Sequence, residues 1–420
     1  MERAGLTQDE LQRRLDTLWR MESPRLVARL ARMLGDLDSA EELAQDALVA
    51  ALEHWPREGM PDNPAAWLMA TAQRRAIDRL RQPHLHAQRH AALWDEQQDQ
   101  GMSAEPQENI DDIGDDLLRL VFVACHPLLP ADARVALTLR LLCGLSTAEI
   151  ARAYLVPEAT IAQRIVRAKR LLADRQVPFE VPRRHELGAR LQSVLDVVYL
   201  LFNEGYAASS GDDWARPLLC EEALRLCRVL NGLLPSQVPV LGLLALMELQ
   251  ASRLRARVGT DGEAVLLPAQ DRRRWDWLQI ERGQQALEHA LVLGGDDDPY
   301  VLQAGIAACH ARARRADQTD WPRIARLYAR LGEVMPSPVV ELNRVVAVSQ
   351  AEGVQAAWPL LLALQQTGTL QGYAPLAVVR GELLAQLGRC DEARAAFSEA
   401  AALTSNARER QTLSARAANG

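Results

Sequence analysis

Apolar residues recur at intervals of three and four along almost the whole chain, as they do in helices that bury one face. Between Ala40 and Leu52 they form one continuous stripe, and acidic and amide side chains occupy the rest of that helix surface. A Pro-rich segment, residues 54–64, interrupts the pattern, and a new helix is predicted from Pro64 toward Arg81. Because no segment alternates apolar and polar residues as a strand would, we predict an all-α fold.

A segment without helical periodicity separates this first region from the next one. Residues 93–116 carry nine acidic side chains, no lysine or arginine, and few apolar residues. Such a composition cannot bury enough apolar surface to fold by itself, so the segment is predicted to be an acidic linker. A solvated tether is the favoured interpretation, and an acidic strand lying in a nucleic-acid channel is the alternative. Strong periodicity resumes at residue 117 and continues to residue 173.

The remainder of the chain, from residue 185, is rich in alanine and leucine, and glycine or proline marks the predicted turns. Its last third contains two successive helix pairs, at residues 320–347 and 375–400. The second pair resembles a tetratricopeptide unit, because a glycine ends its first helix and small and aromatic residues line its second: Gly388, Ala393, Ala396 and Phe397. Stacked units of this kind present a concave face that binds a peptide or another domain. A plain helical bundle is the alternative.

The length of 420 residues and a hydrophobic content of 48% allow more than one core and favour two to four domains. The longest apolar stretch, residues 238–247, is about half of the roughly 20 residues that span a bilayer. Residues 1–20 mix acids with arginines and lack the apolar centre of a signal peptide. We therefore expect a cytoplasmic protein without a membrane segment.

Six cysteines are spread along the chain without a pair at metal-ligand spacing, so we interpret them as reduced core residues. The adjacent Cys125 and His126 lack the further ligands that a tetrahedral site needs. The eight histidines are scattered, and neither a phosphate-binding glycine loop nor a nucleophile motif is present. We expect no metal, no cofactor and no enzymatic activity.

The net charge of −7 at first argues against nucleic acid, but a binding surface depends on the local distribution of charge. Two segments are locally basic. Residues 74–90 contain five arginines and three histidines against one acid, and residues 164–184 contain six arginines and Lys169, the only lysine of the chain. These segments indicate a nucleic-acid partner in spite of the net charge.

The most informative segment, residues 144–170, has the pattern of a helix-turn-helix. Ser146 or Thr147 is expected to cap a short first helix, and Pro157 ends the turn before a second helix over residues 158–173. On the second helix, four apolar residues at spacings of four, three and four form the predicted buried stripe: Ile161, Ile165, Ala168 and Leu172. Another face presents polar residues outward: Thr160, Gln163, Arg164 and Arg167.

Arginine and glutamine on the outward face of such a second helix can form paired hydrogen bonds with guanine and adenine in the major groove. Glu158, at the start of the helix, can accept a hydrogen bond from a cytosine amino group or favour the positive end of the helix dipole. We therefore predict that residues 158–173 form a DNA recognition helix. An ordinary helical hairpin with a solvated polar face is the alternative.

This motif, together with residues 38–48 and 67–81, resembles the extracytoplasmic-function (ECF) sigma factors of bacterial RNA polymerase over residues 10–180. The resemblance implies sigma region 2 at residues 10–92, which binds core polymerase and the −10 promoter element. It also implies sigma region 4 at residues 117–180, which binds the −35 element. The expected partners are core RNA polymerase and promoter DNA, and the acidic helix at residues 38–48 is chemically suited to a basic partner.

The resemblance also implies roles for individual residues. The core-polymerase surface comprises Asp38, Glu41, Glu42, Leu43, Gln45 and Asp46. The −10 element is contacted by Asp62, Asn63 and Trp67, and the nearby promoter backbone by Arg74, Arg75, Arg79 and Arg81. The −35 element is contacted by Glu158, Thr160, Gln163, Arg164, Arg167, Lys169 and Arg170. For Trp67, a place in the core is an equal alternative.

Residues 186–420 extend far beyond a minimal ECF factor and resemble the subgroup with a tetratricopeptide-like C-terminal extension. Because a separate anti-sigma protein commonly holds short ECF factors, the fused helices are expected to supply such control in cis. A regulatory protein or peptide is a further expected partner of these helices. Residues 203–206 and 233–241 look distinctive, but no chemistry is assigned to them.

Two other classes of function fit parts of the sequence. One is a helix-turn-helix regulator that binds an operator and senses a ligand or protein through its repeats. The other is a repeat scaffold whose DNA-binding half is incidental. The acidic helix and the basic helix after the Pro-rich loop favour the sigma factor, because a simple operator-binding regulator needs neither.

Overall fold

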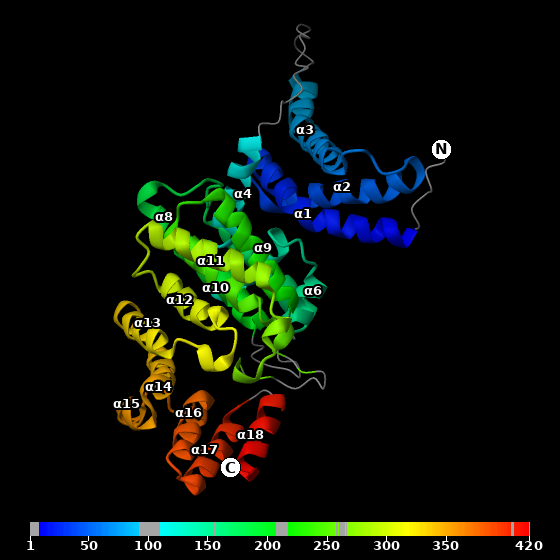
Figure 1. Cartoon of the computed structure of the whole chain (residues 1–420). Helices are drawn as coiled ribbons and strands as arrows, with labels where there is room; N and C mark the ends of the chain where they lie inside the picture. Colours follow the sequence, from blue (N-terminus) through cyan, green and yellow to red (C-terminus); the bar gives the residue numbers. More distant parts are fainter. Residues whose placement is uncertain are drawn as a thin grey trace. The chain divides into compact units, whose positions relative to one another are not determined.

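The computed structural model describes residues 8–91, 110–154, 156–206, 217–257, 259, 265, 267–404 and 407–419 (Figure 1). Within these ranges every regular element is a helix, which confirms the predicted all-α fold. The chain divides into two compact units, Met1–Val197 and Val198–Gly420. None of the helices in the described ranges combines the length and the apolar character that a bilayer crossing requires.

The N-terminal unit contains seven complete helices and the first half of an eighth. They are α1 (Gln8–Leu34), α2 (Leu37–Glu58), α3 (Pro64–Ala91), α4 (Ile110–Ala124), α5 (Ala131–Leu141), α6 (Thr147–Tyr154), α7 (Glu158–Asp174) and α8 (Arg184–Tyr206). Helix α1 packs against α2, α3 and α4, and α7 packs against α5 and α6. The unit thus contains two helical groups, α1–α3 and α5–α7, and α4 packs mainly on α1 and also contacts α5.

Helix α2 forms as its sequence predicts. Asp36 caps its N-terminus, since its carboxylate accepts the backbone N–H groups of Asp38 and Ser39. Gly59 ends it with a φ of 85°, a conformation that a side chain would disfavour. The predicted apolar stripe is buried from Ala40 to Ala51 except for the half-buried Leu48, and Leu52 lies at its exposed edge.

The last part of the predicted acidic linker is helical in the structure. Helix α4 begins at Ile110, inside the predicted linker, and the side chain of Asp116 is fully buried. Its carboxylate binds Arg119 at 2.6 Å, Arg32 at 3.3 Å and Arg29 at 3.4 Å. Asp116 is therefore no part of a solvated tether, because it joins α4 to α1 by ion pairs. The part of the predicted linker at residues 93–109 lies outside the described residues.

The C-terminal unit continues α8 with ten further α-helices. They are α9 (Pro217–Leu233), α10 (Val238–Ala251), α11 (Trp277–Val292), α12 (Pro299–Arg312), α13 (Trp321–Val334), α14 (Pro338–Glu352), α15 (Val354–Gln366), α16 (Ala374–Gln386), α17 (Cys390–Leu403) and α18 (Ala407–Asn419). Four short 3-10 turns complete the described elements: η1 (Leu254–Ala256), η2 (Leu267–Ala269), η3 (Arg272–Arg274) and η4 (Ala316–Gln318).

Helix α10 forms the centre of this unit, because it is apolar on nearly every side and packs against α9, α11 and α12. Two glycines allow the close packing. A Cβ atom on Gly242 would lie 2.8 Å from the backbone nitrogen of Val301 in α12, and one on Gly283 would lie 2.7 Å from Leu249. The buried carboxylate of Glu248 is compensated by Arg228 of α9 at 2.8 Å.

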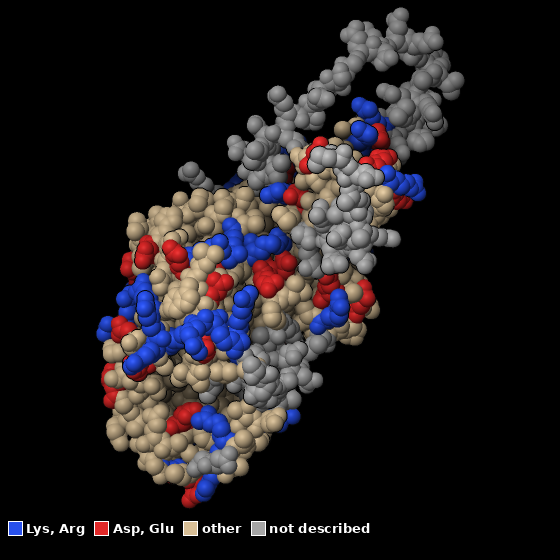
Figure 2. Space-filling model, turned by 45° about the vertical axis from the view of Figure 1, so that its right-hand side comes forward, with Lys and Arg blue, Asp and Glu red and all other residues tan. Residues whose placement is uncertain are grey.

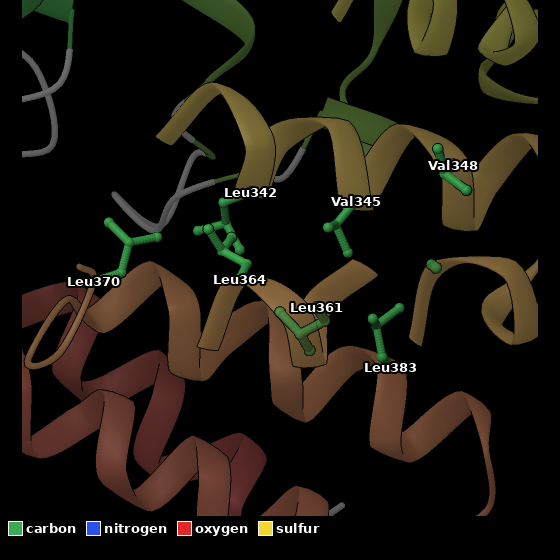
Figure 3. Packing of buried hydrophobic residues seen from close by; sticks show 8 residues of the cluster. Leu342, Val345, Val348, Leu361, Leu364, Leu370 and Leu383 are labelled. Carbon is green, nitrogen blue, oxygen red and sulfur yellow. The ribbon is translucent and has the colours of Figure 1, made fainter. Parts of the chain in front are cut away.

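From α12 onward, most helices that follow one another in the chain also pack against one another. Apolar side chains of α14 point toward those of α15 and α16, and they fill the space between these helices (Figure 3): Leu342, Val345, Val348, Leu361, Leu364 and Leu383. The two predicted helix pairs are present as α13–α14 and α16–α17. Their assignment as tetratricopeptide units stays a prediction.

Five of the six cysteines are buried, as predicted for reduced core residues. The exception is Cys390, which is exposed at the start of α17. The first turn of that helix faces solvent, so the apolar surroundings expected from the sequence are absent there.

Candidate nucleic-acid interface

The turn between α6 and α7 is built by local hydrogen bonds. Ser146 caps α6: its Oγ accepts the backbone N–H of Glu149 at 3.2 Å, and its own N–H donates to the Glu149 carboxylate at 2.8 Å. Thr147 is not the cap. Its hydroxyl donates to the carboxylate of Glu158 at 2.7 Å and so ties the start of α6 to the start of α7. Helix α7 begins directly after Pro157, as predicted.

Helix α7 buries the four residues of its predicted apolar stripe against α5 and α6, and they are Ile161, Ile165, Ala168 and Leu172. On the outward face, Gln163 and Arg167 are exposed, whereas Thr160 is half-buried. Arg164 is also half-exposed, and its Nε lies 3.1 Å from the carboxylate of Asp132 in α5. The face predicted to read bases is thus present on one side of the helix, with one of its arginines held by an ion pair.

Lys169, which the sequence predicts to contact the −35 element, is bound within the protein instead. Its ammonium group is bound by two carboxylates of α2, Asp38 at 2.7 Å and Glu41 at 2.6 Å, and only 10% of its side chain is exposed. Arg140 of α5 binds the other oxygen of Glu41. Lys169 therefore does not offer a free charge to a DNA phosphate in this structure, whereas Arg170 is exposed on the same helix.

Glu41 and Lys169 hold each other in their ionised forms. Burial by itself would raise the pKa of Glu41, but the charges of Lys169 and Arg140 outweigh it and the pKa lies below its ordinary value. Burial would lower the pKa of Lys169, and Glu41 and Asp38 outweigh that effect and raise it. Glu41 is thus a carboxylate and Lys169 an ammonium group throughout the neutral range.

The acidic face of α2 contains most of the residues predicted to bind polymerase. Asp38, Glu42 and Gln45 are exposed there, and Asp46 is half-exposed. Leu43 is different, because only 6% of it is exposed and it packs in the core of the α1–α3 group. The prediction that Leu43 belongs to the binding surface is wrong for this structure, since its position in the apolar stripe turns it inward.

Two of the predicted promoter-binding arginines pair with this acidic face. Arg79 of α3 binds Glu42 at 2.7 Å, and Arg75 lies 3.5 Å from Asp46. Arg74 and Arg81 are exposed and have no ion pair within the described part of the chain. Basic and acidic side chains also lie next to one another at several places on the visible surface (Figure 2). Such exposed pairs are weak, so a phosphate can replace the carboxylate at little cost.

The loop before α3 places its predicted residues at the surface. Asp62 and Asn63 are exposed, and the Oδ1 atom of Asn63 accepts the N–H of Ala66 at 3.1 Å as the cap of α3. Trp67 is half-buried, with its ring edge against Trp55 at a centroid distance of 5.4 Å. Trp67 thus contributes to the core of the α1–α3 group while part of its ring stays accessible.

A contact that the sequence did not suggest joins α8 to the C-terminal end of α4. Ser193 donates to the carbonyl oxygen of Cys125 at 2.6 Å, and Arg190 donates to that of Phe122 at 2.9 Å. The first half of α8 therefore packs as part of the N-terminal unit. Burial raises the pKa of the Cys125 thiol to about 11, and no group of acidic, histidine and cysteine side chains in the described ranges could hold a metal ion.

Comparisons with known proteins match three separate segments of the chain. Residues 18–84 match the model of sigma-70 region 2, residues 119–172 match that of sigma-70 region 4, and residues 190–291 match a family of unknown function (DUF6596). The chain is 44% identical over 391 residues to "Uncharacterized protein R00370" of Rhizobium meliloti (strain 1021). The aligned residues cover 92% of this chain and 91% of that protein. No solved structure matches the chain.

Proposed function

Its sigma-70 regions 2 and 4 make the chain a sigma factor, and we propose that it is of the ECF type. It binds core RNA polymerase in the cytoplasm and directs it to a class of promoters. The observation that supports this function best is helix α7, which buries its apolar stripe and turns Gln163 and Arg167 outward. Sigma factors are not enzymes.

In this proposal, each helical group binds one promoter element. The α1–α3 group binds the −10 element through the loop at Asp62 and Asn63, and its exposed arginines Arg74 and Arg81 follow the DNA backbone. The outward face of α7 reads the −35 element. The exposed acids of α2 bind core polymerase, and Arg75 and Arg79 exchange those acids for phosphates when the complex forms.

The DUF6596 segment and the helices after it regulate these two groups in cis in our proposal. The structural basis is α8, whose first half is bound to the C-terminal end of α4 through Arg190 and Ser193 and to Arg134 of α5 through Ser193, and whose second half belongs to the C-terminal unit. A continuous helix of this kind can transmit a change in the C-terminal unit to the DNA-binding group, by which we mean α4–α7. A regulatory protein or peptide bound by the C-terminal helices would act through the same connection.

Run-off transcription with purified core polymerase tests the function. The full chain is expected to initiate transcripts at a cognate promoter, and core polymerase alone is expected to produce none. A second arm uses a chain that ends at Val197, which keeps the whole N-terminal unit. We expect this shorter chain to bind core polymerase and to initiate at a different rate from the full chain.

Two outcomes would contradict the proposal. Binding of promoter DNA without any binding of core polymerase would identify an operator-binding regulator instead. Equal transcription by the full and the shortened chain would leave the sigma activity intact and rule out regulation by the C-terminal unit.

Substitution of single arginines separates base reading from backbone binding. Arg164→Ala is expected to reduce discrimination at the −35 element by about 1–3 kcal/mol, since a paired hydrogen bond to a base is lost. Its partner Asp132 is exposed and stays solvated, so the fold is unaffected. Arg79→Ala is expected to weaken binding to all sequences alike and to reduce the salt dependence of binding.

The measurement is a titration of the polymerase complex with promoter fragments at several salt concentrations. Each fragment carries either the cognate −35 element or a scrambled one. If both variants lose affinity equally for both fragments, α7 does not read bases through Arg164.

A further inference from the structure

A cavity of about 720 Å³ lies within the C-terminal unit, between helices α12, α13, α14 and α16 and the turns η2 and η4. Its volume is typical of sites that bind small organic molecules. Aromatic and apolar side chains form most of its wall, among them Trp321 and Tyr328 of α13, Val346 of α14 and Leu383 of α16. Neither of the two sigma regions contributes to it.

Polar groups line one side of this cavity. Asn343 and Gln350 lie two turns apart on the same face of α14, and both are exposed. Neither carboxamide has a hydrogen-bond partner within the described residues. Each can therefore donate to and accept from a bound molecule.

Arg272, in the turn η3, adds a positive charge to the cavity wall. Only 8% of it is exposed, its Nη1 donates to the carbonyl oxygens of His310 and Ala313 at 2.6 and 2.7 Å, and its guanidinium lies 4.5 Å from the centre of the Trp275 ring. No carboxylate within the described ranges forms a salt bridge with it. A buried guanidinium is usually paired with an anion, and here both of its partners are neutral carbonyls.

The two carboxylates that line the cavity are already compensated. Asp317 is bound by Arg315, and Glu382 is bound by Arg416 at 2.6 Å. Neither of these arginines lines the cavity. Arg272 is therefore the cavity's cationic group without a carboxylate partner.

More positive charge lies next to Arg272. Arg253 donates to the hydroxyl of Tyr206 at 2.7 Å, and Arg257 lies 3.7 Å from the centre of the same ring. Within the described residues, neither arginine has a carboxylate partner. Burial, and then the charges of Arg253 and Arg272, lower the pKa of His310 to about 4, so this imidazole stays neutral beside them.

We propose that this cavity binds a small organic anion, a molecule with a carboxylate or phosphate group and an apolar body. The anionic group lies beside Arg272, and the body packs between Trp321, Tyr328 and Val346. The carboxamides of Asn343 and Gln350 bind polar atoms of the same molecule. Tyr206, from the segment 203–206 that the sequence left unassigned, orients the neighbouring Arg253.

Binding of the anion is independent of the proposed sigma activity, whereas its use as a signal rests on it. A ligand that orders helices α12–α16 would stabilise one state of the C-terminal unit, and α8 would carry this bias to the DNA-binding group. The cavity is then the place where the in-cis regulator receives its input.

A series of four probes of similar size tests the choice of ligand on the full chain. The probes are benzoate, phenyl phosphate, the neutral benzyl alcohol and the cationic benzylamine, and binding is followed by ligand-detected NMR and by tryptophan fluorescence. We expect at least one of the two anions to bind about tenfold more tightly than benzyl alcohol, because its charge is paired with a desolvated guanidinium. The tighter anion distinguishes a carboxylate ligand from a phosphate ligand.

Two matched variants connect the binding to the cavity. Arg272→Met should remove the preference for anions, whereas Arg273→Met should leave it unchanged, since Arg273 is exposed and already paired with Asp271. Because Arg272 also holds two backbone carbonyls, Val346→Phe serves as an independent test. It keeps Arg272 in place, fills part of the cavity, and should weaken the binding of every probe at unchanged helix content.

The proposal is overturned if all four probes bind equally or if none binds below about 10 mM, an affinity of roughly 3 kcal/mol. Equal loss in the Arg272 and Arg273 variants, or full binding in Val346→Phe, would overturn it as well. Failure of these tests alongside normal transcription with core polymerase would leave the sigma function standing. Binding without any effect on transcription would support the site and contradict its regulatory use.

Discussion

Replacement of Asp116 by asparagine is expected to lower the stability of the contact between α1 and α4 by about 2–3 kcal/mol. Removal of one partner from a buried ion pair costs roughly 3–5 kcal/mol, and the partial exposure of the three arginines reduces that figure here. The asparagine keeps the size of the side chain but removes the charge that Arg29, Arg32 and Arg119 share. The loss is therefore electrostatic and leaves no empty space.

Hydrogen exchange of the full chain measures this effect locally. Amides of α1 and α4 should exchange faster by roughly 30-fold or more, because 1.4 kcal/mol corresponds to a factor of ten. Asp174→Asn is the matched control, because Asp174 is exposed on the surface of α7. Its ion pair with Arg170 is long, at 3.7 Å, and therefore weak. Unchanged exchange in α1 and α4 of the Asp116 variant would show that the arginines do not depend on this carboxylate.

The second large effect is expected from Glu41→Gln. Glu41 is 12% exposed and links Lys169 of α7 to Arg140 of α5. Without its charge, the pKa of Lys169 should fall, because burial, which lowers it, is then opposed by Asp38 alone. A larger fraction of the amine becomes neutral and nucleophilic, and the contact between α2 and α7 opens more often.

The chain offers a direct measurement, because Lys169 is its only lysine. An amine-specific acylating reagent can therefore modify only Lys169 and the N-terminus, and mass spectrometry separates the two products. We expect the Glu41→Gln variant to be acylated at Lys169 about tenfold faster or more, because the amine is more often neutral and less tightly held. Glu42→Gln is the control, since Glu42 is exposed and pairs with Arg79 instead. Equal rates in the two variants would mean that Glu41 does not hold Lys169.

The same ion pair has a pH dependence of defined sign. The pKa of Glu41 is lowered from its ordinary value of 4.5, so its stabilisation is fully present above that value. This stabilisation is lost as the pH falls below 4.5 and through the lowered pKa of Glu41 in the folded chain. Between pH 6 and 8 the contact between α2 and α7 is therefore expected to be insensitive to pH.

These contacts have a consequence for the sigma function. Asp38 and Glu41 belong to the residues proposed to bind core polymerase, and Lys169 to those proposed to bind DNA. While they bind one another, Glu41 and Lys169 are not free to bind a partner, whereas Asp38 stays largely exposed. We therefore propose that assembly with polymerase on a promoter separates α7 from α2, and Glu41→Gln should make this step easier.

The local features of the DNA-binding group were readable from the sequence. The stripe on α7 and the cap at Ser146 depend on residues within one or two helical turns, and the structure contains both as predicted. The same holds for α2, whose stripe begins at Ala40. The alternative cap, Thr147, is not used, because its hydroxyl donates a hydrogen bond to the carboxylate of Glu158 across the turn.

Contacts between distant segments could not be predicted in this way. Lys169 and Glu41 are 128 positions apart, and an arginine or lysine in a basic segment looks the same whether it faces DNA or a carboxylate. Asp116 stands among other acids in the sequence, and only the packing of α4 on α1 brings it to Arg29 and Arg32. Charge by itself therefore did not indicate which of these side chains are buried.

The sequence by itself determined that this protein is helical, where its recognition helix begins, and which face of that helix is apolar, because periodicity and capping act over a few residues. Only the tertiary structure decided that Leu43 is core, that Lys169 is held by α2, and that Arg272 lines a cavity with no carboxylate partner among the described residues. The physical reason is that the energy of a charged or polar side chain depends on the groups that packing places around it. Those groups come from helices far away in the chain.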